Sequence, residues 1–242
     1  TNDEQEVDDT EEEDTDEDTD EDFSGKIEAS VNLGRIDGDN NVGGIAGAIS
    51  MANDLDLLEN LQQSGNNSLN VESKMRAVVL RCENKALVSG SKQSIGGIVG
   101  LQTMGLVKSS GNTAFVDALN AEFVGGVSGQ SHGFIRDCFA KCIISAKSSV
   151  GGIAGSATIV TDCRSLVDIQ DADEKRGAIL GIAAETDSEI ENPIFANLYM
   201  SPGKDIGAID GISYDGLAQA VSKYEFFSLE DLPDVFRQLE LR

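Results

Sequence analysis

Gly43-Gly44-Ile45-Ala46-Gly47 decides the fold of this chain, because it recurs along most of the sequence. Further copies start at residues 96, 125, 151, 177 and 207, so the starts are separated by 53, 29, 26, 26 and 30 residues. A period of this size is typical of repeat architectures. We assign structural turns to the glycines of the first five copies, namely Gly43, Gly44, Gly47, Gly96, Gly97, Gly100, Gly125, Gly126, Gly129, Gly151, Gly152, Gly155, Gly177 and Gly181.

A strand is predicted before each glycine cluster. The segments that start at residues 30, 82, 110, 138 and 163 align so that alternate positions form columns of small or apolar residues. This period of two indicates a strand with one face toward a core. The first column is Ser30, Cys82, Ser110, Cys138 and Cys163, the third is Asn32, Asn84, Asn112, Ala140 and Ser165, and the seventh is Ile36, Val88, Val116, Ile144 and Ile169. Between them, Arg35, Lys85, Lys141 and Asp168 are expected on the solvent face.

Each glycine pair is predicted to form a corner. In most copies an apolar residue precedes the pair and another follows three positions later, as Val42 and Ile45 do in the first copy. An odd separation would place the two side chains on opposite faces of a straight strand. Both can face the core if the chain bends between them, and glycine tolerates backbone angles that are closed to other residues.

The repeats predict an all-β fold, a parallel β-helix or β-solenoid of about six triangular coils. A third short strand is expected before each Ser or Cys column, which gives three strands and three turns in about 26 residues. In such a coil the remaining strands supply the crossover that parallel pairing requires. Neighbouring coils would then stack about 4.8 Å apart.

The solenoid is predicted to span residues 23–211, with three flanking or inserted segments. Residues 1–22 hold 15 of the 43 acidic residues and are expected to be a disordered linker. A calcium loop is the alternative for this leader, but it also needs a turn glycine, and none precedes Gly25. Residues 51–75 are extra and predict a projecting loop or a degenerate coil, and residues 212–242 predict a cap with a helix that starts at Ser228.

Charge and hydropathy exclude two classes of partner. The net charge is −25, and a surface of this sign repels nucleic-acid backbones. No apolar run reaches the roughly 18–20 residues that are needed to span a bilayer. We therefore expect neither nucleic-acid binding nor membrane insertion by this segment.

The candidate catalytic and metal-binding residues do not form a recognisable motif. Cys82, Cys138, Cys142 and Cys163 fit columns of small core residues, so buried free thiols are favoured. Cys138 and Cys163 would be neighbours on adjacent coils, which leaves a disulfide bond open, and a metal site is the remaining alternative. His132 is the single histidine, and we expect it in a solvent-facing turn. The sequence therefore predicts no catalytic residues, no metal and no cofactor.

The repeated Val-Gly-Gly-Ile-Ala-Gly resembles the GLUG motif, a glycine-rich repeat of bacterial exported proteins. The Cys-x-Asn at Cys82 and Asn84 strengthens the likeness, which spans about residues 24–215. Some proteins with this motif are linked to immunoglobulin A proteases. The resemblance implies an extracellular or cell-surface setting and brings no catalytic residues with it.

These observations predict a non-catalytic structural or adhesion module of a bacterial cell-surface or secreted protein. Its expected partner is a host or cell-surface protein or a glycan. Two alternatives remain open at this point. One is a carbohydrate-active β-helix enzyme, and the other is an accessory segment of a secreted protease.

Overall fold

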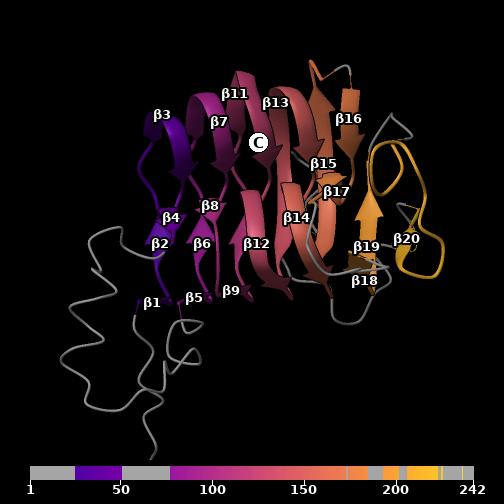
Figure 1. Cartoon of the computed structure of the whole chain (residues 1–242), viewed down its shortest axis with the longest axis horizontal. Helices are drawn as coiled ribbons and strands as arrows, with labels where there is room; N and C mark the ends of the chain where they lie inside the picture. Colours follow the sequence, from indigo (N-terminus) through magenta and orange to yellow (C-terminus); the bar gives the residue numbers. More distant parts are fainter. Residues whose placement is uncertain are drawn as a thin grey trace, which may run out of the picture.

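The computed structural model describes residues 25–50, 77–172, 174–184, 193–201, 206–222, 225 and 236. These residues form a parallel β-solenoid, which confirms the predicted fold class. Its coils follow one another along the long axis of the molecule, from the indigo strands to the orange ones (Figure 1). The acidic segment 1–22 and the insertion 51–75 lie outside the described residues.

The strands form two sheets. Sheet A has nine strands, which are β1 (Lys26–Glu28), β4 (Ala46–Ile49), β5 (Val78–Leu80), β8 (Val99–Gln102), β9 (Leu106–Lys108), β12 (Ser128–Arg136), β14 (Ala154–Thr161), β17 (Leu180–Ala183) and β18 (Ile194–Phe195). Sheet B has eleven, which are β2 (Val31–Asn32), β3 (Ile36–Gly43), β6 (Glu83–Asn84), β7 (Val88–Gly96), β10 (Gly111–Asn112), β11 (Val116–Gly125), β13 (Phe139–Gly151), β15 (Arg164–Gln170), β16 (Glu174–Gly177), β19 (Asn197–Met200) and β20 (Ala218–Ala220). All strand pairs are parallel.

The register between coils matches the columns that the sequence predicts. In the seventh column, each residue pairs with its counterpart on the next coil, in the order Ile36, Val88, Val116, Ile144 and Ile169. The first glycines of the clusters also pair in sequence, as Gly43, Gly96, Gly125, Gly151 and Gly177. Equivalent residues therefore lie one above another along the axis, and their side chains form continuous ladders inside the solenoid.

The shape of one coil differs in detail from three separate short strands. In the best-formed coil, β13 runs as one strand from Phe139 to Gly151 across the stretch where two strands were expected. The chain changes direction at residues with a left-handed backbone, which are Ala29, Arg81, Ser109, Asp137, Asp162 and Ala196 at one position of the coil and Asn41, Ser94, Phe123, Ser149 and Lys175 at another. Each of these residues costs about 1–2 kcal/mol in backbone energy, which the packed core must offset.

The core lies between the two sheets, along the whole length of the stack. It consists mostly of Val, Ile and Ala, and the residues of the central coils are fully buried, including Val88, Val116, Ile144 and Ile153. β-Branched side chains suit a strand because their single preferred rotamer already fits the pleated surface. The ladders of like residues therefore pack with little loss of side-chain freedom.

The solenoid ends when the chain turns back on itself at the sixth glycine copy. The backbone N–H of Ala178 donates to the carbonyl of Gly207, so this copy begins by stacking on the fifth. Ile209 then pairs antiparallel with Ile212, which reverses the chain. Ile206, Ala208 and Ile209 are buried and cover the last core residues. Sheet B nevertheless continues beyond residue 211, because β20 pairs with β19.

The C-terminal segment lies against the side of the solenoid at Phe236. Phe236 is fully buried in a second hydrophobic cluster with Leu166 and Val221. Its ring packs edge-on against Phe139, with ring centroids 5.6 Å apart. Phe139 and Leu166 belong to the outward face of sheet B, so this residue covers an outer face, whereas we expected the segment to close the open end.

A reciprocal pair of hydrogen bonds lies earlier in this segment than Ser228, where we predicted the helix start. The backbone N–H of Glu225 donates to the hydroxyl of Ser222, and the Glu225 carboxylate accepts from the Ser222 N–H at 2.9 Å. This reciprocal pair is a capping box, which satisfies two otherwise unpaired N–H groups. The hydrogen bond that the Glu225 carboxylate accepts from the backbone N–H of Ser222 lowers the pKa of this carboxyl group. The predicted cap at Ser228 lies outside the described residues.

Candidate functional site

The turn positions require glycine because there is no space for a Cβ atom, and not because the backbone has a positive φ angle. None of the glycines that we assigned to corners has a positive φ, so the reason given for them in the sequence analysis is wrong. A Cβ added at Gly96 would lie 2.1 Å from the carbonyl oxygen of Val99, within the same turn. A Cβ at Gly97 would lie 2.2 Å from the carbonyl oxygen of Gly126 on the next coil. Contacts under 3 Å are not tolerated, so any side chain would push the coils apart.

The last glycine of each cluster allows a close contact with the preceding coil. A Cβ at Gly129 would meet the backbone of Ser94 and Ile95 at 2.4 Å. The equivalent approach of Gly155 is to Phe123 and Val124. In a cluster, the first glycine leaves space for the backbone of its own turn, the second for the following coil and the third for the preceding coil. A structural role for these glycines therefore stays our prediction, and the close contacts support it.

The Ser and Cys column connects each coil to its neighbours by hydrogen bonds. The Ser110 hydroxyl donates to the carbonyl of Lys108 at 2.9 Å and accepts from the N–H of Cys82 at 3.0 Å. The Cys138 thiol donates in the same way to the carbonyl of Arg136. This carbonyl belongs to the residue before the left-handed corner residue Asp137, and it also accepts from the N–H of Ser109 on the preceding coil. A small side chain that both donates and accepts is therefore suited to the position.

Asparagine amides form a second ladder beside the glycine corners. Asn32 donates to Asn84, and Asn84 donates to Asn112, each at 2.8 Å. Asn112 also bonds the carbonyl and the N–H of Ala114, and it is fully buried. A buried amide is stable only when its donors and acceptors are satisfied, and stacking supplies the partners. The ladder ends at Ala140, the next residue of the column.

The four cysteines are buried free thiols in the structure, which agrees with the favoured prediction and not with the disulfide alternative. Burial raises the pKa of Cys142 to about 12 and that of Cys163 well above its ordinary value. The N–H of Cys138 donates to the Cys163 sulfur at 3.4 Å. Thiols with raised pKa values and no access to solvent are inert at neutral pH.

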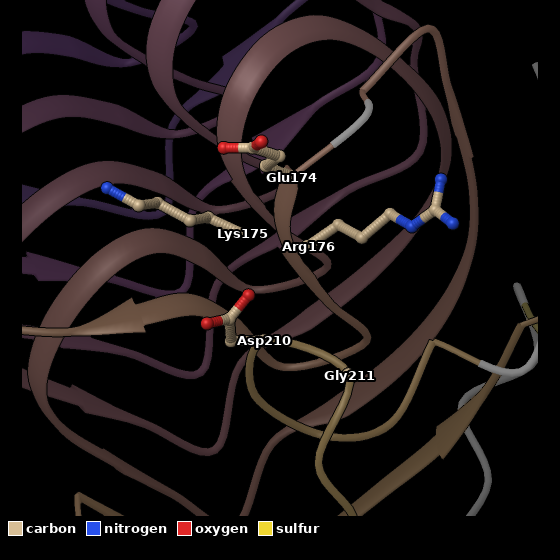
Figure 2. Close-up of a pocket in the computed structure, with 5 residues that line it drawn as sticks. All are labelled: Glu174, Lys175, Arg176, Asp210 and Gly211. Carbon is tan, nitrogen blue, oxygen red and sulfur yellow. The ribbon is translucent and has the colours of Figure 1, made fainter.

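A hollow of about 420 Å³ lies at the fifth glycine corner and is lined by charged residues of both signs. Figure 2 shows Lys175 and Arg176 extending in opposite directions, with the carboxylates of Glu174 and Asp210 apart from each other. The Arg176 guanidinium donates to the carbonyl of Ala172 at 2.8 Å. These side chains do not converge on a common point, so the hollow presents no paired acid and base.

A second candidate surface lies on the outward face of sheet A. We call it the outer stripe. Leu106, Phe134 and Ile159 pair in register on three successive coils, and two residues further along each strand stand Lys108, Arg136 and Thr161. These side chains, with Gly105, line a hollow of about 410 Å³. Phe134 is 47% exposed, although it is one of the largest apolar residues of the chain.

Lys141 is only 5% exposed, although its column predicts a position at the surface, and Leu166, which pairs with it on the next coil, is fully buried. Both are on the face of sheet B where Phe236 packs. His132 is exposed, as expected, although it belongs to strand β12 and not to a turn. The outer stripe itself is visible in the sequence only as a second apolar position in the third strand.

Among the residues that the structure describes, no group of three or more His, Cys, Asp or Glu side chains could hold a metal ion. The same residues contain no helix of the length and apolarity needed to cross a membrane.

Comparison with known protein families, with curated proteins and with solved structures finds no match to this chain. The geometry of its own residues is therefore the basis for a functional proposal.

Proposed function

We propose that this chain is a non-catalytic binding and spacer module of an exported bacterial surface protein. The observation that carries the proposal is the outer stripe, a row of outward apolar side chains on three successive coils, of which Phe134 is exposed and Leu106 and Ile159 are half-buried. Exposed apolar groups that are rimmed by polar residues are typical of interaction sites. The resemblance to the GLUG repeat supports the surface setting.

The ladders inside the solenoid support a structural role. The buried hydrogen bonds of Asn84 and Asn112 link neighbouring coils, as do those of Ser110. A repeat stack of this kind presents the same face at regular intervals along its length. Such a scaffold keeps binding groups in place without loop rearrangement, which suits a spacer that also makes contacts.

A carbohydrate-active enzyme is the alternative from another functional class. Glycoside hydrolysis generally requires two carboxyl groups that flank the scissile bond, about 5–10 Å apart. The hollow in Figure 2 contains two carboxyl groups, from Glu174 and Asp210, and is the place to test for such activity. Its other side chains diverge, so we favour the binding module.

The test combines two measurements on the full chain. Binding is measured on arrays of glycans and of bacterial and host surface proteins, and turnover is measured with a reducing-sugar assay on a polysaccharide panel. We expect at least one saturable ligand and no turnover. A paired Glu174→Gln and Asp210→Asn variant serves as the control for the enzyme alternative.

Turnover that this variant abolishes would contradict the proposal. Saturable binding that persists in the variant and is lost in Phe134→Ser would support it, because the variant alters only the hollow and Phe134→Ser alters only the outer stripe.

A further inference from the structure

We propose that the outer stripe binds an amphipathic α-helix with acidic residues along one flank, supplied by a partner protein. This inference rests on the proposed binding function and names the class of its partner. Three observations support it: the spacing of the apolar side chains, the charges beside them, and the way the chain covers the corresponding face of sheet B.

The spacing of the stripe matches a helix. Leu106, Phe134 and Ile159 occupy successive coils, and neighbouring parallel strands lie about 4.8 Å apart. On a helix, residues three or four positions apart share a face and are separated by about 4.5–6 Å along the axis. On an extended strand, side chains of one face repeat at nearly 7 Å. A helix that lies across the coils can therefore place one apolar residue against each, whereas a strand cannot.

The charges beside the stripe select an acidic flank. Lys108 and Arg136 are paired in register and form a basic pair beside the apolar row, between Leu80 and Thr161 of the adjacent coils. Arg136 has an ion pair with Asp162 at 3.4 Å, but both side chains are exposed, so exchanging this partner costs little. The chain as a whole carries a net charge of −25. An acidic flank is attracted to Lys108 and Arg136 and repelled by the net negative charge of the chain, which favours the orientation of the helix that places this flank beside the two cations.

The protein already covers the outer face of sheet B with an aromatic side chain of its own. Phe236 packs on Leu166 and Phe139, which are outward residues of successive coils. An apolar position on an outer face of this solenoid can therefore bury an aromatic side chain that lies outside the coils. On sheet A, the described residues leave Phe134 47% exposed, so the corresponding position is open to a partner.

The experiment uses two labelled 18-residue helical peptides and the full chain. Both peptides carry Leu at positions i, i+3 and i+7, and one carries Glu along a flank where the other carries Lys. Fluorescence anisotropy at fixed ionic strength measures the dissociation constants. We expect the Glu peptide to bind at least about tenfold more tightly than the Lys peptide, which corresponds to about 1.4 kcal/mol. Phe134→Ser should weaken its binding by about tenfold or more.

A charge reversal and a control variant complete the design. Arg136→Glu should weaken the Glu peptide and strengthen the Lys peptide, which a merely unfolded variant would not do. Leu119→Ser removes an apolar side chain of similar exposure (52%, against 47% for Phe134) from strand β11 of sheet B, and should leave both affinities unchanged. Equal binding of the two peptides, no binding of either, or equal losses in Phe134→Ser and Leu119→Ser would overturn the inference.

The failure of this inference differs from the failure of the proposed function. If the Glu peptide does not bind but an array ligand does, the helix is the wrong partner and the module still binds. If the arrays are blank and a polysaccharide is cleaved, the binding function itself is wrong.

Discussion

At the scale of single residues, the fold depends on glycines at the corners, where no Cβ atom would fit between neighbouring coils. Gly126 lies 2.2 Å, measured from its hypothetical Cβ, from the carbonyl oxygen of Gly152, and 2.5 Å from the Cβ of Ala140. The coils can be stacked in hydrogen-bonding contact at this corner because no side chain separates them. Glycine is usually explained by its backbone freedom, but here the left-handed positions are held by other residues, including Ser94 and Phe123.

Gly126→Ala tests this explanation. The added methyl group has no space, and neither contact is the flexible end of a long side chain, so we expect a loss of about 1–3 kcal/mol in the free energy of unfolding. Gly34→Ala is the matched control, since its Cβ would meet nothing closer than 3.9 Å. It should be neutral or slightly stabilising. Chemical denaturation measures both, and equal effects would contradict the role assigned to space.

The asparagine ladder leads to a second substitution. Asn112→Ala removes one of the two acceptors of the Asn84 amide NH₂, the other being the carbonyl of Ala86, and it removes the side-chain partners of two backbone groups of the buried Ala114. We expect a loss of about 2–4 kcal/mol, because each unsatisfied buried group costs about 1–3 kcal/mol. Asn32→Ala, at the half-buried start of the ladder, should cost less. A reversed order of the two losses in denaturant titrations would show that stacking is not what stabilises these amides.

The thiols allow a chemical test at the same scale. Since burial raises the pKa of Cys142 to about 12, its thiolate is negligible at pH 8, and Cys163 is shifted in the same direction. We expect the native protein to react with a thiol reagent very slowly at this pH and the denatured protein to react at four sites. Two reactive sites after denaturation without reductant would instead indicate a disulfide bond.

At the scale of elements, the ends of the molecule depend on contacts that the repeats do not contain. The C-terminal segment forms the capping pair of Ser222 and Glu225 and buries Phe236 on the outer face of sheet B. This arrangement explains how Leu166 can be fully buried although it points away from the core.

Phe236→Ala tests the contribution of this segment. It removes the aromatic contact with Phe139 and uncovers Leu166, so we expect a loss of about 3–5 kcal/mol if the segment unfolds together with the solenoid. The readouts are thermal unfolding and hydrogen exchange of strands β13 and β15. An unchanged melting temperature with unchanged protection of both strands would mean that the segment does not stabilise the sheet.

Particular residues show how far the sequence alone can go. The columns of Cys82, Val88 and Gly96 were predictable, because a coil repeats its inward positions and the sequence repeats with it. The capping box at Ser222 was also readable, since it has the Ser-x-x-Glu pattern, but we placed the helix start at Ser228. The burial of Lys141 and Leu166 was not readable, because it depends on a distant segment that the period does not predict. The corner glycines were wrongly explained by backbone angles for the same reason, because the space between neighbouring coils can be seen only in the stacked structure.

At the scale of the whole molecule, the account depends on coils that are stacked in parallel and in register. The outer stripe exists only because Leu106, Phe134 and Ile159 come from three consecutive coils. The helix-binding proposal therefore fails if the stack is wrong, whereas the stack can be correct without it. The sheets depend on the residue columns, and the outer stripe depends on the sheets.

Methyl–methyl nuclear Overhauser spectroscopy on a deuterated, Ile- and Val-labelled sample tests the stack most directly. We predict a chain of contacts from Val88 to Val116 to Ile144 to Ile169, and a second chain from Ile98 to Val127 to Ile153 to Ile179, following the order of the coils. Contacts that link these residues in any other order, or their absence between neighbouring coils, would contradict the solenoid.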